Sequence, residues 1–230
     1  MNGPGKERMT RIGAVLFDFD MTLVDSSYAI TECTNLLADA KGLARVTREE
    51  ILKVIGLPIE ESWRTLWGCC DPEWLDYYRK NFREVEQRNL RDFPGTRTVP
   101  KMLRSMGLKL AVVSNRKFAR IAVEKSGLLP FFDVIIGLED VKNPKPHPEP
   151  VLTALERLGV EPGRAVYVGD TDIDVKTAKH AGVVGIGMPT GGFDERNLKA
   201  SGADFVCSDL REIPKLLGGR AYTNKGEIEL

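Results

Sequence analysis

The sequence has few of the features that mark fibrous, membrane-spanning or nucleic-acid-binding proteins. Its 230 residues contain 33 Lys plus Arg and 33 Asp plus Glu. This balance argues against nucleic acid or an anionic membrane as the main partner. The longest apolar runs, such as residues 12–17, have the length of a strand, whereas a membrane span needs about 20 apolar residues. The first ten residues are polar and lack the apolar stretch of a secretory signal.

Cysteine and histidine are also scarce. There are two histidines, His147 and His180, so a histidine-rich zinc site is improbable. The four cysteines form no CxxC pair, and two of them are adjacent and too close for an ordinary bridge. We interpret them as the reduced thiols of a cytoplasmic protein. They are Cys33, Cys69, Cys70 and Cys207.

Short β-rich runs alternate with helical stretches over most of the chain. The runs are apolar on both faces, which is typical of a parallel sheet covered by helices. They span 12–17, 110–113, 134–136, 165–168, 183–186 and 204–206. The amphipathic stretches between them span 99–106, 117–125, 149–158, 175–180 and 210–217, and glycines follow several of them. This alternation predicts a doubly wound α/β sheet of Rossmann-like type.

One region breaks the alternation. Residues 26–92 have helical signals and no convincing strand, including a capping box from Thr47 to Glu50 and an N-cap before proline at Asp71. The helix that begins there is expected to reach about Asn89. We therefore predict a helical subdomain, or cap, inserted into an α/β core. The predicted boundaries are 11–25 plus 93–218 for the core, 26–92 for the cap, and 1–10 and 219–230 for tails.

Two carboxylates follow the first predicted strand. Asp18 and Asp20 are two residues apart, so on a strand their side chains point to the same side. Open α/β sheets place ligands at the carboxyl ends of their strands. Carboxylates this close repel one another unless a cation joins them or one takes a proton, and Mg²⁺ prefers oxygen ligands. The plainer alternative is a pair of aspartates that cap a turn.

A second acidic group follows the strand predicted at 165–168. Asp170, Asp172 and Asp174 stand within five residues after Gly169. Three acids at a strand end favour a bound cation, although Asp172 or Asp174 could simply cap the next helix.

Two further elements suit a phosphate group. Ser114 and Asn115 end the second predicted strand, where a hydroxyl lies beside the backbone amides of the following helix; an N-cap serine is the commoner explanation. Lys145 stands between two prolines, Pro144 and Pro146, which hold its loop extended. A fixed positive charge there could face a phosphate, and an exposed loop lysine is the alternative.

Together these elements resemble the haloacid dehalogenase superfamily, in particular its phosphoglycolate-phosphatase-like branch. The resemblance runs from residue 14 to about 217. It rests on the stretches DFDMTLVDS at 18–26, FPGT at 93–96, VVSN at 112–115, NPKP at 143–146 and YVGDTxxD at 167–174. That branch carries a helical cap after its first motif, where the insertion falls here.

The resemblance implies a magnesium-dependent phosphatase. Asp18 would be the nucleophile and Asp20 the general acid and base. Ser114, Asn115 and Lys145 would bind phosphate or orient its ligands. Mg²⁺ would be held by Asp18, Asp170 and the Asp20 backbone carbonyl, with Asp174 in support.

Two stretches near the predicted site compare differently with the family: one matches its cap loop, and the other departs from its first motif. Gly56-Leu57-Pro58 resembles the cap loop that contributes to substrate choice in the family. The family has glycine after its second aspartate, whereas this chain has Met21. Glycine would ease the turn there, so Met21 is expected to alter the local backbone or narrow the space beside the phosphate.

Several alternatives stay open. A β-phosphoglucomutase-type mutase shares all four motifs. A phosphorylatable receiver domain shares the aspartate, the metal, the hydroxyl and the lysine, but it is a switch of about 120 residues without a helical insertion. We expect a small phosphorylated metabolite as partner, with 2-phosphoglycolate as one candidate, and a monomer or homodimer.

Overall fold

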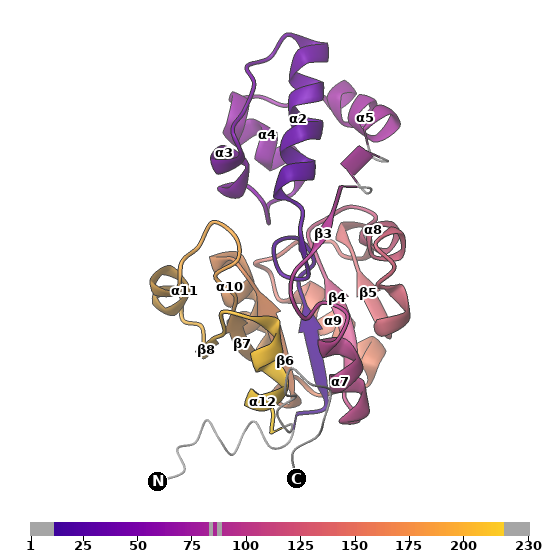
Figure 1. Ribbon diagram of the computed structural model, residues 1–230, viewed down its shortest axis with the longest axis vertical. Coiled ribbons are helices and arrows are strands. Elements are labelled where there is room, and N and C mark those ends of the chain that lie inside the picture. Colours follow the sequence, from indigo (N-terminus) through magenta and orange to yellow (C-terminus); the bar gives the residue numbers. More distant parts are fainter. Residues whose placement is uncertain (1–11, 83–84, 87–88, 219–230) are drawn as a thin grey trace.

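The computed structural model describes residues 12–82, 85–86 and 89–218 (Figure 1). Both predicted tails, 1–10 and 219–230, lie outside the described residues. Six parallel strands form one sheet in the order β5-β4-β1-β6-β7-β8. They are β1 (Ala14–Phe17), β4 (Lys109–Val113), β5 (Val134–Ile136), β6 (Ala165–Gly169), β7 (Val184–Gly187) and β8 (Phe205–Val206). All six predicted strands are therefore confirmed, with ends that differ from the prediction by at most two residues.

Helices cover both faces of the sheet, which explains why the strands are apolar on both sides. In β1, Val15 and Phe17 pack into one core cluster, and Ala14 and Leu16 pack into the other. All four side chains are fully buried. The helices are α7 (Val99–Ser105), α8 (Ala119–Lys125), α9 (Glu149–Leu158), α10 (Asp172–Ala181), α11 (Glu195–Ser201) and α12 (Ile213–Leu216), with short 3₁₀ turns η1 (Leu129–Phe131), η2 (Leu138–Asp140), η3 (Pro162–Arg164) and η4 (Leu210–Glu212).

Two predicted helices begin elsewhere than expected. The helix predicted at 175–180 begins three residues earlier, because Thr171 and Asp174 form a capping box at its start. The helix predicted from Lys117 begins at Ala119, because Phe118 before it has a left-handed backbone with φ of 60°. Both shifts matter for the site, since these helices follow strand ends that carry polar residues.

A group of helices stands at one end of the molecule, apart from the sheet (Figure 1). They are α2 (Ser27–Lys41), α3 (Arg48–Leu52), α4 (Ile59–Trp67) and α5 (Pro72–Asn81). Their apolar side chains form a separate core of Cys33, Leu37, Trp63 and Tyr78. Thr47 and Glu50 form the predicted capping box, and Asp71 caps α5 ahead of Pro72.

Two details of this helical region differ from expectation. The helix that begins at Pro72 ends at Asn81 rather than near Asn89. Strands of two residues each, β2 (Val24–Asp25) and β3 (Arg91–Asp92), pair antiparallel where the chain enters and leaves the region. Sequence patterns did not predict this ribbon because strands this short carry no periodicity.

Candidate active site

The predicted site residues converge at the carboxyl edge of the sheet. Strand β1 lies between β4 and β6, so the loops that follow these strands are neighbours. Asp18 follows β1, Ser114 follows β4 and Asp170 follows β6. Lys145 reaches the same place from the loop before α9. All four side chains are buried, with relative exposures of 1–4%.

Lys145 connects the acids on the two sides of the site. Its Nζ lies 2.9 Å from Asp18 Oδ1 and 2.7 Å from Asp174 Oδ1. It also donates a hydrogen bond to the Tyr167 hydroxyl, at 2.9 Å. Burial alone would lower the pKa of Lys145, but the carboxylates of Asp174 and Asp18 raise it above its ordinary value. Lys145 is therefore a fixed ammonium group inside the site, and not an exposed loop lysine.

Three carboxylates form a compact cluster around this ammonium. One oxygen each from Asp18, Asp170 and Asp174 lies within 4.8 Å of the others, and all three residues are buried. Burial raises the pKa of Asp18 to about 7, with the charges of Asp174 and Asp20 adding to the effect and Lys145 opposing it. Burial, together with the charges of Asp174 and Asp18, raises the pKa of Asp170 well above its usual range.

Asp174 belongs to the carboxylate cluster and is also held by hydrogen bonds at the start of α10. Burial would raise its pKa, but Lys145 and hydrogen bonds from Thr171 lower it. The Thr171 hydroxyl donates to Asp174 Oδ2 at 2.6 Å, and the Thr171 amide donates at 3.1 Å. Asp174 therefore both caps α10 and faces the site. Asp172 pairs with Lys176 on the outside of the same helix, so it takes no part in the cluster.

The cluster has the character of a cation site. One ammonium does not neutralise three buried carboxylates, and uncompensated buried charge is unfavourable. Asp18 Oδ1 accepts no well-aligned hydrogen bond, although Lys145 is close. Thr22 donates to Asp170 Oδ1 at 3.1 Å, which orients that carboxylate. An all-oxygen donor set of this kind suits a hard cation such as Mg²⁺.

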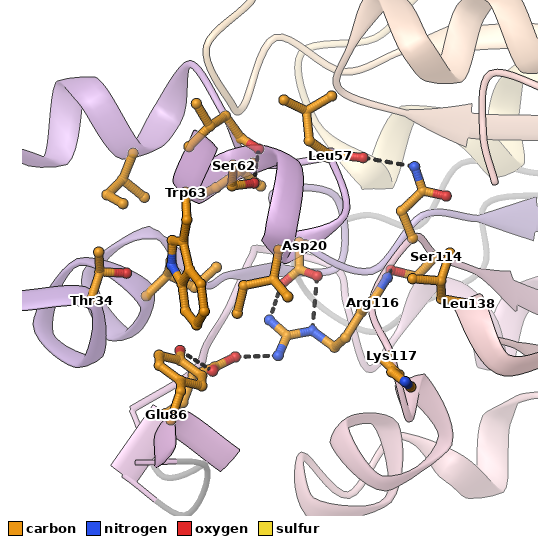
Figure 2. A pocket seen from close by; sticks show the side chains of 18 of the residues that line it. Asp20, Thr34, Leu57, Ser62, Trp63, Glu86, Ser114, Arg116, Lys117 and Leu138 are labelled. Carbon is orange, nitrogen blue, oxygen red and sulfur yellow. Dashed lines mark hydrogen bonds and ion pairs between the residues drawn. The ribbon is translucent and has the colours of Figure 1, made fainter. Parts of the chain in front are cut away.

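Asp20 points away from this cluster. Its two oxygens accept hydrogen bonds from Arg116, at 3.0 Å from Nε and 2.6 Å from Nη2 (Figure 2). Burial would raise the pKa of Asp20, but the Arg116 guanidinium lowers it below its usual value. Arg116 also forms an ion pair with Glu86 of the helical region, and Glu86 accepts a hydrogen bond from the Tyr78 hydroxyl.

Arg116 and Glu86 were not predicted as site residues. Arg116 follows Ser114-Asn115 directly, and its place in a strand-end loop is the signal that could have identified it. Glu86 gave no signal, because a single acid in a charged helical stretch is usually solvent-exposed.

Ser114 and Asn115 have different surroundings. The Ser114 hydroxyl oxygen accepts from the Arg116 amide at 3.1 Å, which leaves its proton available for a phosphate oxygen. Asn115 donates to the backbone carbonyls of Gly56 and Lys145 at 2.9 and 3.0 Å, and it accepts from the Lys145 amide at 2.9 Å. Asn115 thus holds the helical region and the Lys145 loop beside the site.

The turn after Asp20 has a left-handed backbone at Met21. Met21 has φ of 57°, a left-handed conformation that a glycine adopts without strain. Its side chain is buried, and its carbonyl accepts a hydrogen bond from Thr190. Beside it, Gly191 packs so closely on Asp170 that a Cβ atom would lie 2.0 Å from Oδ2. Gly191 is a third site residue that sequence reasoning missed, after Arg116 and Glu86.

A cavity of about 140 Å³ opens onto these groups. Asp18, Asp20, Ser114 and Asn115 line one part of it. Side chains of the helical region, together with core residues such as Arg116, Lys117 and Leu138, line the rest (Figure 2). In the predicted cap loop, Gly56 and Leu57 line the cavity, while Pro58 stands at the start of α4.

The helices and the cysteines bear on the expectations about membrane spans and disulfide bonds. In the described part of the chain, every helix is too short or too polar to cross a bilayer. All four cysteines are free thiols.

Comparisons with known proteins agree with this architecture. The profile of the family described as "Haloacid dehalogenase-like hydrolase" matches residues 15–188. Pyrophosphatase PpaX of Bacillus pumilus is 31% identical over 209 residues, covering 90% of this chain and 97% of the relative. Phosphoglycolate phosphatase of Aquifex aeolicus is 33% identical over 206 residues, covering 88% and 95%. A crystal structure of a haloacid dehalogenase-like hydrolase from Bacteroides fragilis superimposes with a TM-score of 0.79 at 32% identity, covering 88% of this chain and 99% of that one.

Proposed function

This chain belongs to the haloacid dehalogenase-like hydrolase family and is a phosphatase, and we propose that it hydrolyses a small phosphate monoester with Mg²⁺ through an aspartyl phosphate on Asp18. The proposal rests above all on one observation. The buried Asp18 carboxylate faces the Lys145 ammonium at 2.9 Å, beside Asp170 and Asp174. A carboxylate that attacks phosphorus needs the charge of the phosphate neutralised around it.

Mg²⁺ is the proposed cofactor. Asp18, Asp170 and the Asp20 backbone carbonyl would hold it, with Asp174 in support, and the excess of buried carboxylates over cations fits this assignment. When bound, the ion supplies positive charge to the nucleophile and to the phosphate.

The other residues bind and orient the phosphate. Lys145 would neutralise its non-bridging oxygens, and the Ser114 hydroxyl would donate a hydrogen bond to one of them. Asn115 would keep the Lys145 loop in place through its hydrogen bonds to that backbone. Such prepositioned charges supply most of the rate in phosphoryl transfer.

Asp20 is the proposed acid and base. It would give a proton to the leaving alkoxide and then take one from the water that hydrolyses the aspartyl phosphate, steps that contribute about 10²–10⁴-fold. In the structure it is paired with Arg116. Asp20 would therefore have to exchange this partner for the substrate, which agrees with its position on the cavity wall.

We further propose that residues 26–92 act as a cap over a core of residues 11–25 and 93–218. Lids of this kind shed water from the reaction. The two links from this region to the Ser114-Asn115-Arg116 segment, through Gly56 and Glu86, support the idea. The free thiols, including the exposed Cys69, support a reducing compartment such as the cytoplasm.

A panel of phosphate esters assayed with Mg²⁺ and with chelator tests the proposal. We expect release of inorganic phosphate that needs Mg²⁺, and acid-stable trapping of phosphate on the wild-type chain but not on Asp18→Asn. Turnover that persists in chelator, or a labelled Asp18→Asn chain, would contradict it. Conversion of glucose 1-phosphate into an isomeric sugar phosphate, without release of inorganic phosphate, would identify a mutase instead.

A further inference from the structure

The cavity beyond the phosphate end is apolar, and this bears on the substrate. Its walls come from the four helices α2, α3, α4 and α5 of the proposed cap, from the loop before α4, and from core residues such as Phe118 and Leu138. Representative side chains are Ile30, Ile51, Val54, Leu57, Trp63 and Leu75. Figure 2 labels two of them, Leu57 and Trp63, among the side chains that line the cavity. A leaving group attached to a phosphate on Asp18 would lie against these side chains.

Most polar side chains on this wall already have partners. The Ser62 hydroxyl donates to the Val54 carbonyl at 3.0 Å. The Tyr78 hydroxyl donates to Glu86, and Arg116 is shared between Asp20 and Glu86. These groups are therefore not free to replace the water around a strongly polar leaving group.

Arg79 is different. Its Nη2 atom is buried and has no hydrogen-bond partner within the part of the chain that the structure describes. Among the described residues, Arg79 forms an ion pair with Asp76, at 3.9 Å on the same helix. Arg79 lines the cavity. It therefore offers a hydrogen-bond donor to a leaving group that lies mainly against apolar side chains.

The size of the cavity limits the guest. Its 140 Å³ includes the phosphate end, and an apolar protein cavity of roughly 150 Å³ holds one benzene molecule, so the apolar body of the substrate is no larger than a single six-membered ring. Glycolate or a second phosphate would leave the hydrocarbon walls without contacts, and burial of their charge there would be unfavourable beyond the reach of Arg79.

Building on the proposed function, we propose that the substrate is a phosphate monoester of an alcohol with an apolar body no larger than one six-membered ring, carrying one hydrogen-bond acceptor within reach of Arg79. This class differs from 2-phosphoglycolate and from pyrophosphate, which have no apolar body.

The apolar body is tested with alkyl phosphates of nearly equal leaving-group basicity. With the full chain and Mg²⁺, kcat/KM should rise from ethyl to butyl to cyclohexylmethyl phosphate, by up to fourfold or so for each methylene that fits. A flat or falling series, with ethyl phosphate still hydrolysed, would overturn this inference alone. Absence of any Mg²⁺-dependent hydrolysis would instead refute the proposed function.

A variant that fills the cavity provides the second test. Ile30→Trp should reduce the ratio of kcat/KM for cyclohexylmethyl phosphate to that for ethyl phosphate at least tenfold. Leu36→Trp is the matched control, because Leu36 is an exposed residue of the same helix, and it should keep the wild-type ratio. Equal ratios in the two variants would contradict the assigned position of the body.

The acceptor is tested with 2-phosphoglycolate against ethyl phosphate, which differ by a carboxylate. Arg79→Met should lower the ratio of their kcat/KM values about tenfold, whereas Lys80→Met, an exposed change on the same helix, should not. An unchanged ratio in Arg79→Met would show that Arg79 meets no substrate acceptor.

Discussion

At the scale of single residues, the site concentrates negative charge around one ammonium group. Asp18 is the member that the proposed chemistry needs as a nucleophile, and its buried carboxylate has a pKa of about 7. An amide at this position keeps the shape but cannot form the aspartyl phosphate. It also removes one of the charges that repel one another.

We therefore expect Asp18→Asn to lose turnover by a factor on the order of 10⁶, as removal of a nucleophile typically does, without loss of thermal stability. Circular dichroism and phosphate release on one preparation measure both. Asp172→Asn is the control, since that carboxylate pairs with Lys176 outside the cluster. Activity near the wild-type level in Asp18→Asn would refute its role.

At Met21, backbone strain and side-chain burial have opposite effects on the free energy of unfolding. Its left-handed backbone costs about 1–2 kcal/mol relative to glycine, whereas loss of a buried Met side chain costs about 2–5 kcal/mol. Because the side chain is only 1% exposed, the second effect should dominate. Met21→Gly should lower the free energy of unfolding by roughly 1–3 kcal/mol, as measured by urea denaturation. A more stable variant would show that backbone strain is the larger effect.

Residue patterns predicted the polar members of the site but not their partners. Asp18, Ser114, Lys145 and Asp170 all follow strands or lie between prolines, and these contexts can be read along the chain. The ion pair of Arg116 with Glu86 joins residues 30 apart, and only the three-dimensional fold brings them together.

At the scale of elements, the loop after β4 connects the sheet to the helical region. Arg116 stands in this loop and contacts both Asp20 and Glu86, which are buried. Removal of a shared cation leaves two buried carboxylates without compensation.

Arg116→Met should therefore lower stability by about 3–5 kcal/mol, the range for breaking a buried ion pair, and should also reduce kcat because Asp20 loses its orientation. Thermal denaturation and steady-state kinetics measure the two effects. Arg120→Met, an exposed change on α8, is the control. If Arg116→Met and Arg120→Met behaved alike, the link between loop and cap would have no energetic role.

The loop before α4 offers a cleaner pair of variants. Gly56 and Gly68 both have left-handed backbones, with φ of 102° and 76°. A Cβ on Gly56 would lie 3.3 Å from Thr171 Cγ2, whereas a Cβ on Gly68 would have open space.

Both alanine variants should lose roughly 1 kcal/mol of stability from the backbone. Gly56→Ala alone should also raise KM, because it pushes the loop away from Thr171 and from the Asn115 hydrogen bond. Equal KM values for the two variants would indicate that the loop position does not affect substrate binding.

Elements with strong periodicity were predictable, and those without it were not. The strand at 134–136 and the helix at 149–158 have the predicted ends. The β2–β3 ribbon was missed because each strand has two residues. The helix from Pro72 was predicted too long because its charged amphipathic pattern continues past Asn81.

At the scale of the whole molecule, strand order decides which loops meet. The chain visits β1 first and then places β4 and β6 on either side of it. This arrangement gathers acids that are more than 150 residues apart, as Asp18 and Asp170 are. Their mutual repulsion opposes folding, so the stability of the whole molecule should depend on pH and on a bound cation.

The direction of the pH effect follows from the pKa shifts. The pKa values of Asp18 and Asp170 are raised in the folded state, so their contribution to stability is present below their unfolded pKa of about 3.9. That contribution is lost as the pH rises through the folded pKa, about 7 for Asp18. Asp20 and Asp174, with lowered pKa values, lose their contribution only as the pH falls below about 4.

In chelator, the melting temperature should therefore fall as the pH rises from about 5.5 to about 8. Mg²⁺ at about 100 times its Kd should add roughly 2.7 kcal/mol to the free energy of unfolding. This corresponds to a rise in melting temperature of about 5–10 °C for a chain of this size, and the rise should be larger at the higher pH.

Asp170→Asn should flatten the pH slope in chelator and abolish the response to Mg²⁺, because it removes a charge and a proposed ligand together. Scanning fluorimetry measures all three quantities. A full Mg²⁺ response in Asp170→Asn would show that the ion binds elsewhere. A flat wild-type profile in chelator would show that folding does not raise the pKa values of these carboxylates.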